Sequence, residues 1–472
     1  MSRKMKNKVL HNLKIERIAT EGKCVGHHEG KVVFVSNVAP GDLVDARVTR
    51  GRSSFMEAEA IAIHEHSPDR VIPFCEHFGT CGGCKWQHIS YELQMAYKRQ
   101  QVVDQFQRIA KVPLPEVMPI IGAGNTRYYR NKLDFTFSNN RWLTREEIDS
   151  GEDFERNALG FHIPKRFDKI VDIKHCYLQG SLSNEIRNGL REFALAENLS
   201  FYDIIGQTGL LRNLIIRTAQ EDQVMVIVQF GEDDPDGIEK VMRFLKENIP
   251  GITSLLYIVN LKKNETFQDL DVHVYAGKDH IEETMEGLRF KIGPKSFYQT
   301  NSQQAYRLYQ VAREFAGLTG EETVYDLYTG TGTIANFVAG NAQQVIGIEY
   351  VEPAIADAKE NALLNGITNT LFYAGDMKAV LNESFVSQYQ KPDVVITDPP
   401  RAGMHEDVVE MLLHLEATKI VYVSCNPATQ ARDVALLSAK YHVKRIQPVD
   451  MFPQTYHVEN VVLLELKSND DQ

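Results

Sequence analysis

Apolar runs and amphipathic stretches alternate regularly between residues 323 and 423. The apolar runs have the length of buried strands, and the stretches between them repeat their apolar residues at helical spacing. The expected strands are 323–327, 344–349, 370–374, 393–397 and 420–423, and the expected helices begin at Thr333 and span 352–364 and 406–415. Successive β-α units of this kind predict a doubly wound, Rossmann-like α/β domain with a parallel sheet.

Two further apolar runs follow residue 440. They begin at Val443 and Val458, and no helix of useful length fits between them. Strands joined by a short connection pair antiparallel, so this sheet should end in an antiparallel pair. Sheets that bind nicotinamide dinucleotides usually end in a parallel strand instead.

The N-terminal part alternates like an all-β unit. Runs 31–35, 42–48 and 57–63 are separated by glycines and by Pro40-Gly41. This spacing predicts a small barrel of the oligonucleotide-binding kind, which commonly carries single-stranded nucleic acid. A barrel that only packs on its neighbour would show the same pattern. Residues 1–52 hold eleven Lys and Arg against five Asp and Glu, and this excess favours RNA.

The middle of the chain reads as an α+β unit. We expect an amphipathic helix over 91–110, paired strands at 210–218 and 224–230, and helices at 183–197 and 237–248. The segment from Arg127 to Lys132 interleaves tyrosines with cations, as a surface that stacks bases and neutralises phosphates would. An ordinary charged loop over packed tyrosines is nearly as good an interpretation.

Composition bounds the class of protein. A chain of 472 residues that is 43% hydrophobic should form about three domains, which we place at 1–66, 67–290 and 291–472. The net charge of −11 argues against a uniformly basic nucleic-acid binder. No apolar run is long enough to span a bilayer, and the N-terminus lacks the apolar core of a secretory signal. We therefore expect a cytoplasmic protein, without a membrane partner, whose six cysteines are not paired in disulfides.

Three cysteines lie close together in a glycine-containing segment. They are Cys75, Cys81 and Cys84, and Cys176 could supply a fourth thiolate. Four such ligands could hold an iron–sulfur cluster or a tetrahedral zinc ion. Zinc sites usually show two closely spaced cysteine pairs, and this segment has only one, so we favour the cluster.

The C-terminal unit also carries a cysteine at a strand end. Cys425 directly follows the strand 420–423 and precedes an expected helix. Reacting groups in open α/β sheets lie at the carboxyl ends of strands, and a helix N-terminus should favour the thiolate. A cysteine that merely fills the core would fit the position equally well.

A glycine turn marks the cofactor site. Gly330-x-Gly332-x-x-Ala335, with Glu349 nineteen residues after Gly330, suits a dinucleotide as well as S-adenosylmethionine, because both need backbone contact and an acid for ribose hydroxyls. The antiparallel ending favours S-adenosylmethionine. So does the loop Asp398-Pro-Pro-Arg401, whose prolines fix the backbone around an acid at a strand end.

A thiol and a second acid together indicate methylation at carbon. Uracil C5 becomes nucleophilic only after a thiolate adds to C6, and a base must then remove the C5 proton. Cys425 could be that thiolate and Glu459, at the start of the last strand, that base. Enzymes that methylate exocyclic amines also use Asp-Pro-Pro loops, but they need no thiol.

These residues resemble the S-adenosylmethionine-dependent RNA uracil-5-methyltransferases, a family that contains an iron–sulfur 23S ribosomal RNA enzyme and the tRNA T-loop enzyme. The likeness extends over nearly the whole chain. It rests on a TRAM-like N-terminal barrel, the four cysteines, and the motifs Phe297-Tyr-Gln-Thr-Asn301, Asp326-Leu-Tyr-x-Gly-x-Gly332, Asp398-Pro-Pro-Arg401, Ser424-Cys-Asn-Pro427 and His457-Val-Glu459. The family often has a cysteine where this chain has Thr329.

The resemblance implies a role for each matching residue. Cys425 would be the nucleophile and Glu459 the base. Residues lining the cofactor site would be Gln299, Tyr328, Glu349, Asp376 and Asp398. Cys75, Cys81, Cys84 and Cys176 would hold a [4Fe-4S] cluster. The target uracil would be flipped out of an RNA loop.

The resemblance also bears on the RNA. In this family the cluster and the TRAM-like barrel accompany ribosomal RNA enzymes more often than the tRNA enzyme, so we expect a monomer acting on 23S rRNA, with tRNA as the alternative. Two other classes fit parts of the sequence. They are a dinucleotide-dependent iron–sulfur oxidoreductase and a noncatalytic RNA-binding scaffold.

Overall fold

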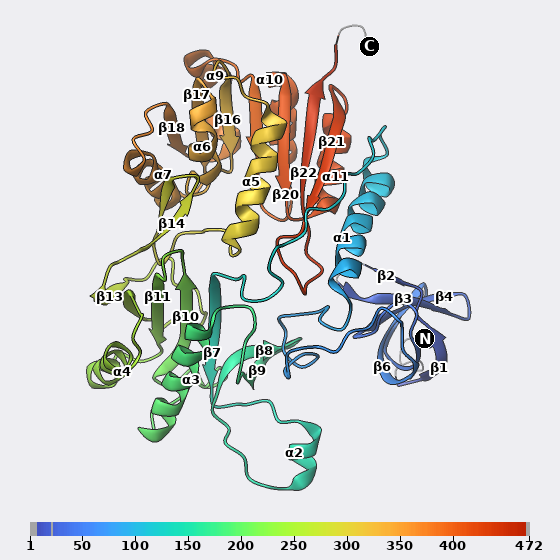
Figure 1. Ribbon diagram of the computed structural model, residues 1–472, viewed down its shortest axis with the longest axis vertical. Coiled ribbons are helices and arrows are strands. Elements are labelled where there is room, and N and C mark those ends of the chain that lie inside the picture. Colours follow the sequence, from blue (N-terminus) through green and yellow to red (C-terminus); the bar gives the residue numbers. More distant parts are fainter. Residues whose placement is uncertain (1–6, 20–21, 469–472) are drawn as a thin grey trace.

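Three large β-sheets and a separate two-stranded hairpin organise the chain, and the three large sheets can be followed in Figure 1. The computed structural model describes residues 7–19 and 22–468. The C-terminal sheet stands above the central sheet, and the N-terminal sheet lies beside the lower end of helix α1 (Figure 1). No helix within these ranges is long and apolar enough to cross a bilayer.

The C-terminal sheet has seven strands in the order β18-β17-β16-β19-β20-β22-β21. The strands are β16 (Thr323–Leu327), β17 (Gln344–Glu349), β18 (Thr370–Ala374), β19 (Val394–Thr397), β20 (Lys419–Ser424), β21 (Tyr441–Val449) and β22 (Glu459–Leu466). The first five in this order run parallel, while β22 runs antiparallel to both β20 and β21. The predicted parallel sheet with an antiparallel ending is confirmed.

Helices cover both faces of this sheet, and each face has its own core. One face packs against α5 (Ser302–Ala316), α6 (Thr333–Val338), a short 3₁₀ turn (Ala339–Asn341) and α7 (Glu352–Leu364). The other packs against α1 (Tyr91–Gln105), a π-helical turn (Phe106–Ala110), α8 (Met377–Val380), α9 (Glu383–Tyr389), α10 (Glu406–Leu415) and α11 (Pro427–Leu437). The helix expected over 91–110 therefore changes hydrogen-bonding pattern in its last turn. Its apolar face, with Val102 and Phe106, lies against the C-terminal sheet.

The central sheet also has seven strands, in the order β13-β12-β11-β10-β7-β8-β9. They are β7 (Lys132–Ser138), β8 (Ala158–Ile163), β9 (Arg166–Asp172), β10 (Leu211–Thr218), β11 (Val224–Phe230), β12 (Ser254–Val259) and β13 (His273–Gly277). Only the β11–β12 pair is parallel. A short helix α2 (Arg145–Ser150), closed by a capping box on Thr144, follows β7.

The two faces of the central sheet pack against different parts of the chain. One face buries Leu214, Ile216 and Val226 beneath α3 (Ser181–Ala196) and α4 (Pro235–Asn248). The alternate residues Ile215 and Ile227 point the other way and join the core of the C-terminal sheet, together with the hairpin β14 (Ile281–Met285) and β15 (Leu288–Ile292). The period-two alternation of β10 and β11 thus joins the central sheet to the C-terminal sheet.

The N-terminal unit is a six-stranded sheet around a small core of its own. Its order is β1-β5-β6-β4-β3-β2. The strands are β1 (Val9–Lys14), β2 (Arg17–Ile18), β3 (Cys24–His28), β4 (Lys31–Ser36), β5 (Leu43–Gly51) and β6 (Phe55–Glu65). The expected all-β N-terminal unit is confirmed.

Candidate active site and cysteine cavity

A glycine turn follows β16 at the carboxyl edge of the C-terminal sheet. Gly332 has φ +72°, and a Cβ there would lie 2.7 Å from the Cβ of Ala358, so only glycine fits. Asp326, buried at the end of β16, accepts hydrogen bonds from the Thr329 hydroxyl (2.5 Å) and the Ala335 amide (3.0 Å). These bonds join the strand to the first turn of α6 and leave the turn's backbone open to a ligand.

Acidic side chains stand around this turn. Glu349, at the end of β17, accepts from the Gly330 amide at 3.2 Å and from the Val351 amide at 3.0 Å. Asp376 follows β18 and caps α8. Burial and the charges of Asp433, Asp376 and Glu349 raise the pKa of Tyr328 to about 12. Tyr328, Glu349 and Asp376 therefore share one neighbourhood, on adjacent strand ends.

The segment before α5 closes the turn from the other side. The Thr331 hydroxyl donates to the Phe297 carbonyl (3.5 Å), and the Asn131 side chain donates to the Gln299 carbonyl (2.9 Å). Asn301 caps α5 by accepting from the Gln304 amide. Gln299 is thereby held, half-buried, beside the glycine turn.

Strand register brings Cys425 and Glu459 together. Ser424, the last residue of β20, pairs with Asn460 of β22. The next residues toward the carboxyl edge are Cys425 and Glu459, so they face each other across the two strand ends. Cys425 is half-buried, whereas Glu459 is 4% exposed. The expectation that Cys425 is only a sealed core residue is not met.

The loop after β19 packs against the segment that carries Cys425. The Arg401 carbonyl accepts from the Asn426 side chain at 3.0 Å and from the Thr429 hydroxyl at 3.3 Å. The Arg401 guanidinium lies 3.4 Å from Nδ1 of His457. Asp398, at the start of this loop, is therefore fixed at the same sheet edge as Cys425 and Glu459.

Burial dominates the electrostatics of this edge. It raises the pKa of Cys425 to about 11, with the charges of Glu459 and Asp398 adding to the shift and Arg401 opposing it. It also raises the pKa of Glu459 to about 8 and that of Asp398 to about 7. In the free protein, burial and the charges of Glu459 and Asp398 raise the pKa of the Cys425 thiol, so the helix N-terminus expected to favour the thiolate does not set that pKa alone.

This arrangement suits nucleophilic addition coupled to proton transfer. A thiol stands next to a carboxyl group whose pKa is near neutrality, which is where a general base works best. The motifs alone predicted no role for Arg401 or His457. The Arg401 charge opposes the rise in the pKa of both Cys425 and Glu459. The pKa of His457 is lowered to about 4, chiefly by burial, and the Arg401 charge adds to that shift. The position of Arg401 directly after the two prolines was the available signal.

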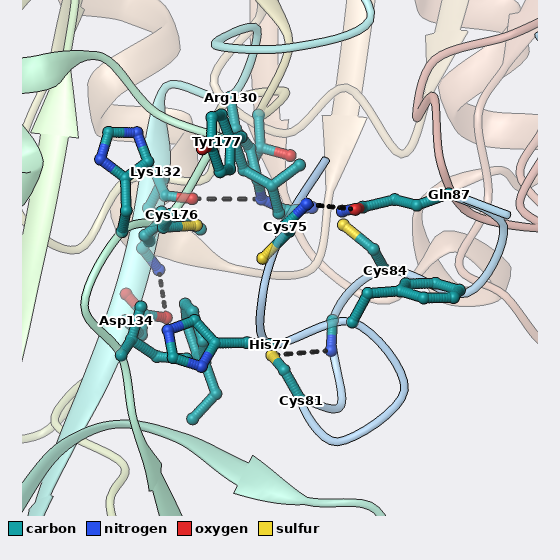
Figure 2. Close-up of a pocket in the computed structure, with 18 residues that line it drawn as sticks. Cys75, His77, Cys81, Cys84, Gln87, Arg130, Lys132, Asp134, Cys176 and Tyr177 are labelled. Atoms are coloured by element: carbon teal, nitrogen blue, oxygen red, sulfur yellow. Dashed lines mark hydrogen bonds and ion pairs between the residues drawn. The ribbon is translucent and has the colours of Figure 1, made fainter. Parts of the chain in front are cut away.

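The four remaining candidate ligands line one cavity of about 370 Å³ between the 75–88 segment and the central sheet. Figure 2 shows the sulfur atoms of Cys75, Cys81, Cys84 and Cys176 arranged around it. The Gln87 side chain accepts from the Cys75 amide at 3.2 Å, and the Asn184 side chain accepts from the Cys176 amide at 2.8 Å.

The thiols of this cavity are neutral in the free protein. Burial raises the pKa of Cys81 to about 11 and that of Cys84 to about 12, and the neighbouring cysteines add to both shifts. Within residues 7–19 and 22–468, no three or more His, Cys, Asp or Glu side chains are arranged so that they could hold a metal ion. The four predicted ligands thus share a cavity without forming a ready-made single-ion site.

Comparison with known proteins identifies the family. Residues 267–467 match the family described as tRNA (Uracil-5-)-methyltransferase, and residues 4–61 match the TRAM domain. An uncharacterized RNA methyltransferase of Bacteroides thetaiotaomicron is 58% identical over 95% of this chain and 100% of its own length. One of Porphyromonas gingivalis is 55% identical over 96% of this chain and 99% of its own.

A solved structure has the same architecture throughout. The tRNA (uracil-54, C5)-methyltransferase of Pyrococcus abyssi, in complex with S-adenosyl-L-homocysteine, is 29% identical, with a TM-score of 0.74. The match covers 96% of this chain and 100% of that one.

The strand order, the antiparallel ending and the glycine turn define a class I methyltransferase fold. Such enzymes take their methyl group from S-adenosylmethionine. The chain belongs to the RNA uracil-5-methyltransferase family and carries a TRAM domain at its N-terminus. It is therefore an S-adenosylmethionine-dependent enzyme whose substrate is RNA.

The charge coupling at the sheet edge predicts how the Cys425 thiol titrates. Because the Glu459 charge raises the pKa of Cys425, Glu459→Gln should lower that pKa from about 11. We expect faster alkylation of the Cys425 peptide at pH 9 in this variant, measured by mass spectrometry with iodoacetamide. Glu465→Gln, farther along β22, is the control and should alkylate like the wild type. Equal rates in all three proteins would contradict the coupling.

Proposed function

We propose that this chain forms 5-methyluridine in RNA, with Cys425 as nucleophile and Glu459 as base. The observation that carries the proposal is the pairing of Ser424 with Asn460, which sets a thiol opposite a buried carboxyl group at the cofactor edge of the sheet. Gln299, Tyr328, Glu349, Asp376 and Asp398 are the proposed cofactor-site residues, because all of them gather at the same edge.

The proposed reaction balances through these two side chains. The Cys425 thiol first loses its proton to solvent. The thiolate sulfur then bonds to C6 of the uracil, and the electron pair of the C5–C6 double bond moves toward C5 and O4. C5 then takes the methyl group of S-adenosylmethionine, and S-adenosylhomocysteine leaves. Glu459 accepts the C5 proton, the C6–S bond breaks, and the double bond and the thiolate are restored. Arg401 favours the charged forms of both side chains.

An exposed aromatic cluster supports an RNA loop as the substrate. Tyr128 is 47% exposed, and its ring packs near those of His175 and Tyr177, at 6.3 and 5.9 Å between centroids. The Arg127 guanidinium lies 3.9 Å from the centroid of the Phe74 ring. Unpaired bases stack on such rings, and the cations neutralise phosphates. We propose this surface as part of the RNA-binding face.

We propose 23S rRNA as the target because the TRAM domain and the four-cysteine segment resemble the ribosomal RNA enzymes of the family. tRNA is the second candidate. It is favoured by the end-to-end likeness to an archaeal enzyme that is named for uracil 54 of tRNA. A tRNA enzyme can therefore have this whole architecture, so the barrel alone does not decide the substrate.

Cells that lack this chain should lose 5-methyluridine at one or more positions of 23S rRNA and keep it in tRNA. The measurement is mass-spectrometric mapping of 5-methyluridine in both RNAs. Complementation with the wild type should restore the modification, and complementation with Cys425→Ala should not. Loss from tRNA alone would favour the second candidate, and unchanged RNA would contradict the activity.

Replacing the proposed base should trap the enzyme on its RNA. In Glu459→Gln the C5 proton stays, so the C6–S bond persists, and we expect a methylated RNA–protein adduct on denaturing gels. Adding Cys425→Ala should abolish that adduct. In the wild type, turnover should rise with pH through about 8, as Glu459 becomes deprotonated, and keep rising toward about 11, as Cys425 forms its thiolate. Full turnover by Glu459→Gln without any adduct would refute its assignment as the base.

We propose that the cysteine cavity holds a [4Fe-4S] cluster. The support is that four thiols line one buried space, and cysteine thiolates are the ligands that hold such clusters. Cys75, Cys81, Cys84 and Cys176 would be its ligands. On binding the cluster these four thiols would lose their protons. The positive iron ions would then offset the cost of burying four thiolates next to one another.

Protein purified without oxygen should contain iron and inorganic sulfide in the ratio of that cluster. Cys84→Ser should lower both. Cys24→Ser is the matched control, because the Cys24 thiol is buried in the N-terminal sheet and donates to the Val38 carbonyl instead. Stoichiometric zinc without sulfide would contradict the cluster and favour the alternative ion.

A further inference from the structure

The loop that joins β21 to β22 (residues 450–458) is bonded to a segment more than 350 residues earlier in the chain. In Figure 1 this loop hangs below the C-terminal sheet, beside the lower end of α1. It leads directly into Glu459, the first residue of β22. The loop therefore leads into the strand end whose pairing with β20 and β21 sets the Glu459 carboxyl group at the edge.

Gln454 is the centre of this contact. Its carbonyl accepts from the amides of Lys85 (2.8 Å) and Trp86 (3.0 Å), which directly follow Cys84. Its amide donates to the Gln94 side chain at 2.9 Å, and the two side chains bond to each other at 3.0 Å. Gln454 has φ +67° and is 5% exposed, so these bonds satisfy a buried residue in an uncommon backbone conformation.

Gln94, on α1, makes the remaining hydrogen bonds of this contact. Its side-chain nitrogen also donates to the carbonyls of Trp86 (3.0 Å) and Ile89 (3.1 Å). The side chain is 1% exposed, and so it fixes the end of the cysteine segment and the 450–458 loop to one another in a dry environment. A hydrogen-bond network of this kind is rigid because each unpaired member would cost the full desolvation penalty.

A buried ion pair holds the same loop one turn farther along α1. Lys98 bonds to Asp450 at 2.6 Å and to the Phe452 carbonyl at 2.9 Å, and both charged side chains are fully buried. The Tyr91 hydroxyl donates to the other Asp450 oxygen at 2.7 Å. A buried pair is weak evidence for stability but strong evidence for a defined arrangement here, because either charge alone would be costly.

We propose that Gln94, Lys98, Asp450 and Gln454 are positioning residues through which the cysteine segment places Glu459 for proton abstraction. The inference rests on the proposed role of Glu459. It assigns the cysteine segment a task in the last chemical step, since Lys85 and Trp86 connect the cavity wall at Cys84 to the loop before the base. The backbone of Asp450 and Met451 also accepts from Gln304 and Asn301 beside the cofactor turn. The bonds of Gln94 and Gln454 given above reach neither Cys425 nor that turn, so changes at these two residues should spare addition and methyl transfer.

The test separates the methyl-transfer step from the proton-abstraction step. Gln94→Met keeps the side-chain volume and removes the hydrogen bonds without stranding a buried charge. With labelled S-adenosylmethionine and excess RNA, we expect a burst of about one methyl per enzyme at the wild-type rate. Steady-state turnover should then be slowed about tenfold, with methylated adduct accumulating, since displacements near 1 Å are costly at reacting groups. The KM for S-adenosylmethionine should not change.

Gln229→Met is the matched control, because Gln229 is a buried glutamine of β11 that bonds to Asn260 in the central sheet. It should show no burst. Gln454→Asn, which tolerates the left-handed backbone, is a second and milder variant with the same expected burst. Hydrogen exchange over residues 451–458 should be faster in Gln94→Met and in Gln454→Asn than in the control Gln229→Met.

The inference would be overturned if the burst rate and the steady-state rate fell together in Gln94→Met and Gln454→Asn. It would also be overturned if neither rate changed from the wild type in these two variants. If either happens while Glu459→Gln still accumulates adduct, the proposed function stands and only the positioning role is lost. If Glu459→Gln turns over normally without adduct, the proposed function and this inference both fail.

Discussion

Desolvation of ionisable groups at the carboxyl edge of the C-terminal sheet is the constraint on which the site depends. Asp326, Asp398 and Glu459 all have pKa values raised toward or above neutrality, and burial is the first cause in each. These carboxyl groups hold protons in conditions where exposed ones would not. The edge is therefore less negative than its composition suggests, which matters for an enzyme that admits polyanionic RNA.

The order of the last strands turns this edge into a reactive site. β22 lies between β20 and β21 and runs against both, so its first residue meets the last residues of its neighbours. A parallel strand in that place would bring its final residue to the edge, and Glu459 would stand at the opposite end. Under the proposed mechanism, the antiparallel ending is thus what brings the base to the thiol.

The sequence predicted the C-terminal sheet well because its strands are buried on both faces. The bounds of β16, β17, β18, α7 and α10 agree with the expected ranges, and apolar runs separated by amphipathic stretches leave little ambiguity there. The polar contacts were not predictable in this way. Gln94 and Lys98 look like the solvent face of α1, and only partners about 350 residues away make them buried.

The candidate site likewise contains residues that could be predicted from the sequence and residues that could not. Local motifs found Cys425, Asp398 and the glycine turn, because each directly follows a strand whose end is easy to recognise. The importance of Arg401 lies in its distance to His457 and in its effect on Cys425 and Glu459, and none of these is a property of the motif itself. For the four cysteines, the sequence spacing indicated a set of ligands. It did not indicate whether the thiols are arranged in space to hold a metal ion.

Substrate choice is decided outside the reactive edge. The proposed addition to C6 and removal of the C5 proton require an unstacked uracil, which loops of many RNAs can supply. The end-to-end match to a tRNA enzyme means that the three-part architecture is compatible with that class of RNA too. Under the proposed mechanism, discrimination comes from contacts to flanking nucleotides. The surface proposed for such contacts, the aromatic and cationic groups around Tyr128, borders the cysteine cavity, because His175 and Tyr177 belong to both.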